Sequence, residues 1–309
     1  MSQEIEVARV QQFNANVMHL SQQKGSHLEM CVRRETQKGK TQFFDRIGSV
    51  AAVERTGRHA STPQLDTPHS RRMVTLTDYE WADLVDDQDK IRMLFDPTSE
   101  YAIAAAWAFG RSKDDKIIAN AFGNAYAGED GTTLVPHPTT MKYAANDGTS
   151  FTNLNVKTLR AIRRILRKNE VDKSLPLYLA CTSDSIESML GQTEATSQDF
   201  ASVKALVQGD IDTFMGFKFI EINRLLATTA TQASATTGVV GSGTALSGTN
   251  RACIAWASDG LLMSVGEDFT TKMSERDDKG YAMQVYARMS IGSTRMEEEK
   301  VVEVICKEA

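Results

Sequence analysis

Apolar positions near the N-terminus are sparse and follow a helical spacing. Four of them recur at intervals of three or four residues, and these are Val10, Phe13, Val17 and Leu20. This spacing predicts a helix that ends near Gly25. Leu28, Met30 and Val32 then alternate with polar neighbours, which predicts a short strand. Residues 1–45 hold too few apolar side chains to bury a core alone, so we interpret them as an N-terminal arm.

The next segment has the pattern of a long β-hairpin. Residues 43–53 (FFDRIGSVAAV) and 73–81 (MVTLTDYEW) are rich in β-branched and aromatic side chains. Residues 54–72 between them are polar and basic, and two prolines interrupt them. Because a lone hairpin is only marginally stable in water, it must pack on something. Its support is either a neighbouring subunit or the surface of its own domain.

The longest helical pattern follows an acidic stretch. Asp96 suits the N-cap and Pro97 the first helical position, and residues 98–122 contain no proline. Gly110 is their only glycine, and alanines are frequent. Twenty-five helical residues extend about 37 Å. Small side chains along this helix let other elements approach it closely.

A second helix is predicted over residues 155–170. Its apolar stripe consists of Val156, Leu159, Ile162 and Leu166, and a basic stripe beside it consists of Arg160, Arg163, Arg164 and Arg167. The basic stripe is either a solvated helix face or a surface that touches packaged DNA or an acidic neighbour.

The remainder mixes short helices with strands. Strands are predicted over residues 175–182, 212–222, 251–258, 261–266, 280–292 and 300–307. A helix is expected from Ser183 or Asp184 to Leu190, and a further helix is expected to start at Ser197 or Asp199 and to end at Gly209. Residues 225–250 carry no charge and have the composition of a flexible loop. Together the elements predict an α+β fold that ends in strands.

Charge and composition narrow the class of protein. The chain has 309 residues and net charge -5, which argues against a protein whose main task is to grip nucleic acid. It does not exclude one that encloses DNA. No apolar run reaches about 18 residues, and the N-terminus lacks the apolar segment of a signal peptide. We therefore expect no membrane partner and a location in the cytoplasm where the chain is made.

No pattern of catalytic or metal-binding chemistry is visible. The four cysteines, Cys31, Cys181, Cys253 and Cys306, are far apart, and the five histidines form no metal-binding spacing. The glycine-rich residues 238–248 lack the Lys-Ser/Thr of a phosphate-binding loop. The acidic cluster at Asp83, Asp86, Asp87 and Asp89 does not fit a calcium loop and is expected to be a solvated face. We expect no cofactor, no metal and no enzyme activity.

The order of these elements resembles a known family. Residues 86–128, 201–225 and 251–305 look like the Hong Kong 97-type major capsid proteins of tailed double-stranded DNA bacteriophages. The resemblance implies an N-terminal arm (1–45) and an extended β-hairpin loop (46–82). It also implies a peripheral domain (83–173 and 266–309) with a spine helix at about 97–122. An axial domain (174–265) would carry the flexible loop 225–250.

That resemblance also implies a function and partners. The chain would self-assemble into hexamers and pentamers of an icosahedral virion capsid in the host bacterial cytoplasm, enclosing double-stranded DNA without sequence specificity. A portal protein, a decoration protein and, because only about 45 residues precede the hairpin, a separate scaffolding protein are the expected partners. The alternatives are an encapsulin-like compartment shell and, from another class, a soluble α/β enzyme with an unrecognised site.

Assembly contacts are expected between basic residues of the hairpin tip and acidic residues of a neighbour. The basic set is Arg55, Arg58, Arg71 and Arg72, and the acidic set is Asp83, Asp86 and Asp87. Opposite charges on two surfaces favour and orient their association.

Overall fold

The computed structural model describes residues 21–59, 61, 64–86, 98–146, 152–192, 213–226 and 250–308. Several predicted features lie wholly or largely outside these residues. They are the helix over 3–24, the cap at Asp96 and Pro97, the helix after Ser197 or Asp199, and the loop 225–250.

The chain divides into two compact units. One comprises Met1–Ser26, Asp78–Arg111 and Glu267–Ser290, and the other comprises His27–Thr77, Ser112–Gly266 and Ile291–Ala309. Helix α2 and strands β12 and β13 run from one unit into the other, so their two parts are described separately below.

Helix α2 (Thr98–Phe122) matches the predicted long helix. Buried positions recur every four residues along it in two neighbouring rows. One row is Ala105, Phe109, Lys113, Ile117 and Ala121, and the other is Gly110, Asp114 and Ile118. Two adjacent rows form the broad buried stripe of a helix that packs on more than one element.

The first unit joins the N-terminal half of α2 to parts of three strands. Strands β4 (Thr77–Val85), β12 (Leu261–Arg276) and β13 (Ala282–Arg295) belong to a sheet with the order β1-β12-β13-β4, in which β1 is Arg33–Thr36. The rings of Phe109 and Phe269 meet with their centroids 5.5 Å apart. The prediction that the strand from residue 261 ends at 266 is wrong, because β12 continues to Arg276.

Strands β12 and β13 are joined by the short helix η4 (Asp277–Lys279). Gly280 and Tyr281 there both have positive φ angles, 64° and 59°. A left-handed conformation suits glycine but is strained for tyrosine. Tyr281 and, in β12, Met273 both expose more than half of their surface.

The end of the N-terminal arm lies on α2. In the first unit, Arg111 donates to the Gln22 side chain and to the Gln23 carbonyl, and the Lys24 ammonium lies 5.3 Å from the centre of the Trp107 ring. These polar contacts fix a segment that has few apolar side chains of its own.

In the second unit, Asp114 holds the chain as it leaves the arm. Its carboxylate accepts the backbone N–H groups of His27 (3.0 Å) and Leu28 (3.1 Å), and both Asp114 and Leu28 are fully buried. Glu29 pairs with Lys113 at 3.0 Å. The strand predicted over residues 28–32 is wrong: the helix η2 (Glu29–Cys31) occupies it, because Leu28 turns into the core, and β1 (Arg33–Thr36) follows.

The predicted hairpin is present, with different limits. Strand β2 (Thr41–Ile47) pairs antiparallel with β3 (His69–Thr75), and β3 continues the sheet to β5 (Ala125–Ala127) and β6 (Thr133–Val135). The strand predicted over 73–81 is divided at Leu76 between β3 and β4, which belong to different sheets. A Cβ added at Gly266 would lie 2.4 Å from Leu76, so the break packs tightly against β12.

A six-stranded mixed sheet forms the core of the second unit. Its order is β7-β14-β11-β8-β10-β9, with bounds Lys142–Ala144, Val301–Lys307, Asn250–Ala257, Leu177–Cys181, Phe217–Glu221 and Thr213–Phe214. The strand predicted over 212–222 is instead the tight hairpin β9–β10, turned at Met215 and Gly216, whose φ angles are positive.

This sheet crosses one of the expected domain boundaries. Strand β14 pairs with β11 along seven residues and with β7, although residues 266–309 and 174–265 were expected to lie in different domains. Both β11 and β14 are buried on both faces, so β14 is an interior strand of this sheet. Apolar side chains on both faces are typical of strands covered on two sides.

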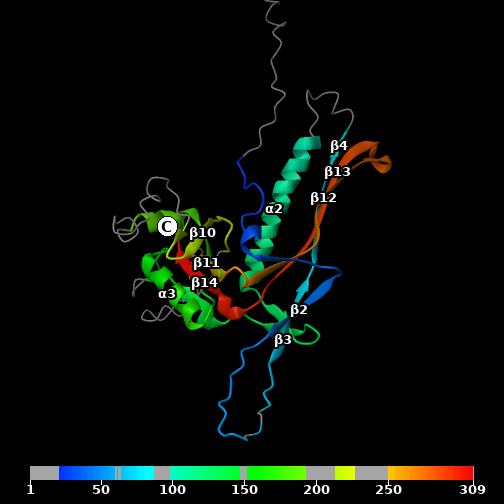
Figure 1. Cartoon of the computed structure of the whole chain (residues 1–309). Coiled ribbons are helices and arrows are strands. Elements are labelled where there is room, and N and C mark those ends of the chain that lie inside the picture. Colours follow the sequence, from blue (N-terminus) through cyan, green and yellow to red (C-terminus); the bar gives the residue numbers. More distant parts are fainter. Residues whose placement is uncertain are drawn as a thin grey trace, which may run out of the picture. The chain divides into compact units, whose positions relative to one another are not determined.

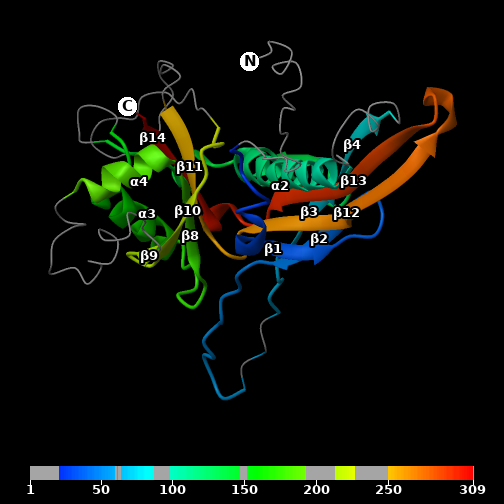
Figure 2. The same cartoon turned by 90° about the horizontal axis from the view of Figure 1, so that it is seen from above.

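Helices α3 (Val156–Lys168) and α4 (Ser183–Leu190) lie beside strands β8, β10 and β11 (Figure 2). Asn155 caps α3 by accepting the Thr158 N–H at 2.7 Å. Trp256 of β11 is fully buried, stacks on Tyr178, and donates its indole N–H to the Cys31 carbonyl at 3.0 Å. The short helices η3 (Thr139–Met141) and η5 (Glu298–Lys300) precede β7 and β14.

Candidate assembly surface

The most conspicuous surface of the second unit is the excursion between β2 and β3, residues 48–68 (Figure 1). Gly48 donates to the Pro68 carbonyl at 2.8 Å and closes its neck. Among its described residues no other backbone hydrogen bond crosses the excursion. Four apolar side chains at or near it are more than half exposed, and they are Ile47, Val50, Val53 and Leu65.

Arg55 and Arg58 lie in the excursion, as predicted, and both are exposed. Arg55 donates to the carbonyls of Gly57 (2.9 Å) and Arg58, so its contacts within the chain are local. The described part of the excursion contains nothing that covers its apolar surface or pairs with the cations at its end.

Arg71 lies in β3 and not at the tip of the hairpin. It faces Asp45 across the β2–β3 pairing, donates to that carboxylate at 3.1 Å, and lies 5.6 Å from the centre of the Phe43 ring. Both partners of the ion pair are exposed, so it contributes less than about 1 kcal/mol. The guanidinium stays at the surface, beside the base of the excursion.

The prediction that Arg72 offers an exposed contact at the tip is wrong. Its side chain is 1% exposed, and it pairs with Glu298 of the same chain. Successive residues of a strand point to opposite faces, so Arg71 reaches solvent while Arg72 enters the interior. A side chain that is enclosed within its own subunit is not available to a neighbour.

Three arginines converge on Glu298 beneath the excursion. Arg46 and Arg295 lie 3.8 and 3.7 Å from its carboxylate, and Arg72 contacts it directly. Arg46 and Arg72 also donate to the Met296 carbonyl. Burial lowers the pKa of Arg72 and of Arg295, and Glu298 offsets part of that effect. This cluster ties β2 and β3 to the segment between β13 and β14.

Arg295 also closes the C-terminal end of α2. It is fully buried and donates to the carbonyls of Ala121 (2.8 Å), Gly123 (3.0 Å) and Val135 (3.2 Å). The last carbonyls of a helix lack partners within it and carry partial negative charge, which a guanidinium neutralises. The base of the excursion and the end of the long helix are therefore held by one cluster.

His137 is buried beside this cluster. Its ring lies 5.7 Å from the ring of Phe122. Burial, together with the charges of Arg295 and Lys142, lowers the pKa of His137 to about 3. The imidazole is neutral at pH 7, because an added proton would meet two cations in a desolvated site.

The predicted acidic contacts lie in or beyond β4. Asp83 is exposed, and its carboxylate accepts the Leu84 N–H at 2.8 Å. Asp86 is exposed as well, whereas Asp87 lies outside the described residues. The pairing of these carboxylates with arginines of another copy stays a prediction.

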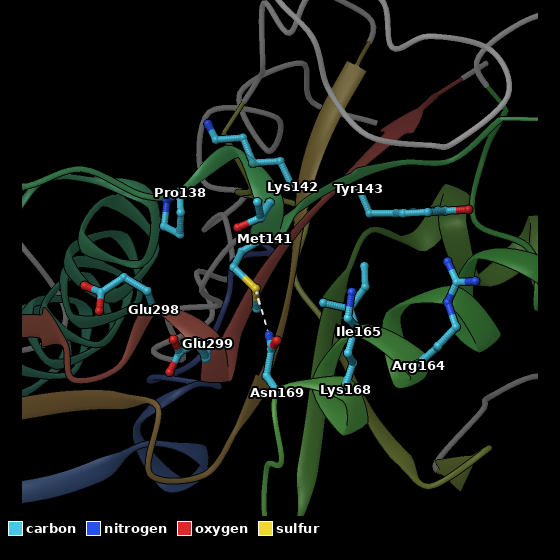
Figure 3. Close-up of a pocket in the computed structure, with 11 residues that line it drawn as sticks. Pro138, Met141, Lys142, Tyr143, Arg164, Ile165, Lys168, Asn169, Glu298 and Glu299 are labelled. Carbon is cyan, nitrogen blue, oxygen red and sulfur yellow. Dashed lines mark hydrogen bonds between the residues drawn. The ribbon is translucent and has the colours of Figure 1, made fainter. Parts of the chain in front are cut away.

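A pocket of about 720 Å³ opens between the C-terminal end of α3 and η5 (Figure 3). Arg164, Ile165 and Lys168 line one side, and Glu298 and Glu299 line the other. Asn169 donates to the Met141 sulfur at 3.2 Å on the floor. The walls have opposite charges, and Lys142 at the rim pairs with the buried Glu303 at 2.8 Å.

The described residues include four free cysteines as well as His, Asp and Glu side chains. No group of three or more His, Cys, Asp or Glu among them could hold a metal ion. Cys181, Cys253 and Cys306 are buried, and a hydrogen bond with Cys253 together with burial raises the pKa of the Cys306 thiol. Such thiols are not the accessible thiolates that react as nucleophiles. Among the helices that the structure describes, none has the length and apolarity needed to cross a membrane.

Sequence reasoning missed the arginine cluster. Arg46, Arg72, Arg295 and Glu298 are separated by up to 252 residues, and no spacing rule links them. The alternation of β3 was a usable signal, because it places neighbouring arginines on opposite faces.

Comparisons with known proteins bear on the whole chain. The family model described as "Phage capsid protein" matches residues 5–308. No curated protein matches the sequence. The fold is similar to that of the capsid of cyanophage P-SCSP1u (TM-score 0.72, 16% identity), over 99% of this chain and 95% of that one.

Two further solved structures share the fold. The capsid of Ralstonia phage GP4 has a TM-score of 0.72 and 8% identity, and covers 97% of this chain and 96% of its own. The acid-stable capsid of Helicobacter pylori bacteriophage KHP30 has a TM-score of 0.69 and 9% identity, and covers 99% and 98%. The fold is thus the predicted Hong Kong 97-type α+β fold.

Proposed function

Because this chain belongs to the family of phage capsid proteins, we propose that it is the major shell subunit of a phage head. Copies of it would associate as hexamers and pentamers into an icosahedral capsid that encloses double-stranded DNA. Its role is structural, and the chemistry of the shell is the chemistry of contacts between subunits. We further propose that the capsid assembles in the host bacterial cytoplasm and that portal, scaffolding and decoration proteins are its partners.

The observation that carries this proposal is the excursion of residues 48–68. It exposes Ile47, Val50, Val53 and Leu65 on a segment with little hydrogen bonding of its own. Fully burying an aliphatic side chain contributes about 1.5–3 kcal/mol, so covering the exposed parts of four contributes a few kcal/mol. A neighbouring subunit is the surface that would cover them.

A rigid base makes such a contact specific. The cluster of Arg46, Arg72 and Arg295 around Glu298 holds the neck of the excursion against the rest of its unit. A pre-ordered base lowers the entropy lost on binding. One weak contact per neighbour lets a misplaced subunit leave, whereas many simultaneous contacts stabilise a closed shell.

The expected domain roles support the same proposal. The loop would lie on neighbours, and the two units would form the wall. The described end of the arm packs within its own chain. Residues 46–82 remain the proposed extended loop, which starts at the end of β2 and contains β3. Helix α2 remains the proposed spine.

Electron microscopy tests the function directly. The full chain is expressed alone and together with its neighbouring gene products. Closed shells, tubes or sheets are the expected result in at least one case. A protein that stays a small oligomer at every concentration, in both cases, would overturn the proposal. Shells that contain a protein cargo and no DNA would point instead to a cellular compartment.

A further inference from the structure

The outward face of α3 is strongly basic. Six of its thirteen residues are cations and none is acidic, and the cations are Lys157, Arg160, Arg163, Arg164, Arg167 and Lys168. All are exposed except Arg167, which is half-buried. The opposite stripe, with Leu159, Ile162 and Leu166, is fully buried in the core. The helix is thereby fixed with its charged face toward solvent.

No ion pair with a described residue neutralises these charges. Within the residues that the structure describes, none of the six forms an ion pair. Arg167 donates to the Val171 carbonyl at 3.0 Å, and its charge is one of several influences that lower the pKa of Asp172. The protein as a whole has net charge -5, so this face differs in sign from the average surface.

The balance of charged and apolar side chains on this face indicates whether its partner is a protein or DNA. The exposed large apolar side chains of the described residues include none from α3. Protein–protein interfaces have an apolar centre that is depleted in charge, whereas interfaces with DNA are more polar and much more positive. The excursion of residues 48–68 fits the first description, and α3 fits the second.

We propose that the exposed face of α3 binds the phosphate backbone of the double-stranded DNA that the shell encloses, without reading its sequence. This inference rests on the proposed function. From Lys157 to Lys168 the helix rises about 16 Å, and duplex DNA carries one negative charge per about 1.7 Å of its axis. Guanidinium groups, four of the six cations here, match phosphate oxygens in a forked geometry.

The pocket beside α3 limits this surface on one side. Figure 3 shows Arg164 and Lys168 across the pocket from Glu298 and Glu299. A phosphate close to those two carboxylates would be repelled. The DNA therefore lies along the exposed face of α3 and does not enter the pocket.

Binding of a short duplex tests the inference. A fluorescent 24-base-pair duplex of random sequence is titrated with unassembled full-length subunit between 25 and 200 mM NaCl. Fluorescence anisotropy then gives affinity and its salt dependence. We expect the R160Q/R164Q variant to bind at least tenfold more weakly, with a salt slope lower by about 1.8, since each lost phosphate contact removes about 0.9.

A matched variant controls for overall charge. K272Q/K279Q removes two exposed cations from the region of β12 and η4 and should change neither quantity. Equal losses in both variants, or no loss in R160Q/R164Q, would overturn the inference. Binding of polyglutamate by the wild type in preference to the duplex would also overturn it, in favour of an acidic protein partner.

Shell formation by the same variants separates this inference from the proposed function. Shells of R160Q/R164Q that form normally but hold DNA less stably support the inference. Loss of shells with unchanged duplex binding would make α3 a contact between subunits and overturn it. If the wild type forms no shells under any condition, the proposed function fails, whatever the duplex result.

Discussion

Gly110, in the middle of α2, meets the backbone of Gly25 so closely that a Cβ on Gly110 would lie 2.4 Å from the Gly25 carbonyl carbon. The glycine that interrupts an otherwise alanine-rich helix is therefore the place where the arm crosses it. The backbone cannot yield as the end of a flexible side chain can.

We expect Gly110→Ala to destabilise the protein. In an exposed helix interior this change usually stabilises by about 0.5–1 kcal/mol, but here the added methyl group displaces the arm. Chemical denaturation of the unassembled subunit should show a net loss of about 1–3 kcal/mol, the usual cost of overpacking. Gly57→Ala, where a Cβ meets nothing within 4 Å, is the matched control. A G110A variant as stable as the wild type would contradict the crossing.

Arg295→Lys should cost about 2–3 kcal/mol of unfolding free energy. Lysine keeps the charge but cannot reach the carbonyls of Ala121, Gly123 and Val135 together, and buried carbonyls without partners are costly. The same substitution at Arg288, which pairs with Glu267 in a half-exposed site, should cost less than about 1 kcal/mol. Urea titration of both variants measures the difference. Equal costs would show that the forked geometry of Arg295 is unimportant.

His137 should make the subunit sensitive to acid. Its pKa is lowered from 6.5 to about 3 in the folded state, so the unfolded chain binds one proton more between these values. Stability is then full above pH 6.5 and falls by about 1.4 kcal/mol per pH unit as the pH drops toward 3.

Replacing His137 by phenylalanine should remove this component of the pH dependence. Urea titrations at pH 7, 6, 5 and 4 would show a shallower loss of stability for H137F than for the wild type. His59→Asn, in the exposed excursion, should leave the slope unchanged. A slope that H137F does not alter would mean that other groups dominate acid unfolding.

The excursion should be more important for the shell than for the subunit. The triple variant V50S/V53S/L65S removes exposed apolar surface and should leave the subunit's urea midpoint unchanged within error. Shells should form less readily or fall apart at lower denaturant concentration, as light scattering would show. Substitution of the exposed polar residues Thr56 and Gln64 by serine is the control. Shells unaffected by the triple variant would remove the excursion from the interface.

Local pattern was enough to predict most elements. Helix α2 begins and ends within one residue of its predicted limits, and α3, α4, β11, β13 and β14 lie where periodicity placed them. The wrong predictions concern residues whose structure depends on contacts with parts of the chain that are distant in sequence. Leu28 has the alternation of a strand residue, but it is buried in the core, where its N–H donates to Asp114. Strand β14 pairs with β11 and β7, and hydrophobic periodicity does not predict which strands pair.

Local sequence was sufficient to predict the α+β elements, the hairpin excursion and the basic face of α3, because each depends on residues close together in the chain. The different roles of Arg71 and Arg72 arise only in the folded chain. The two are identical in type and adjacent, and alternation sends them to opposite faces. Which face is the interior depends on Glu298, 226 residues away from Arg72, and on the end of α2 that the same cluster closes. A pairing over that distance exists only once the chain has folded.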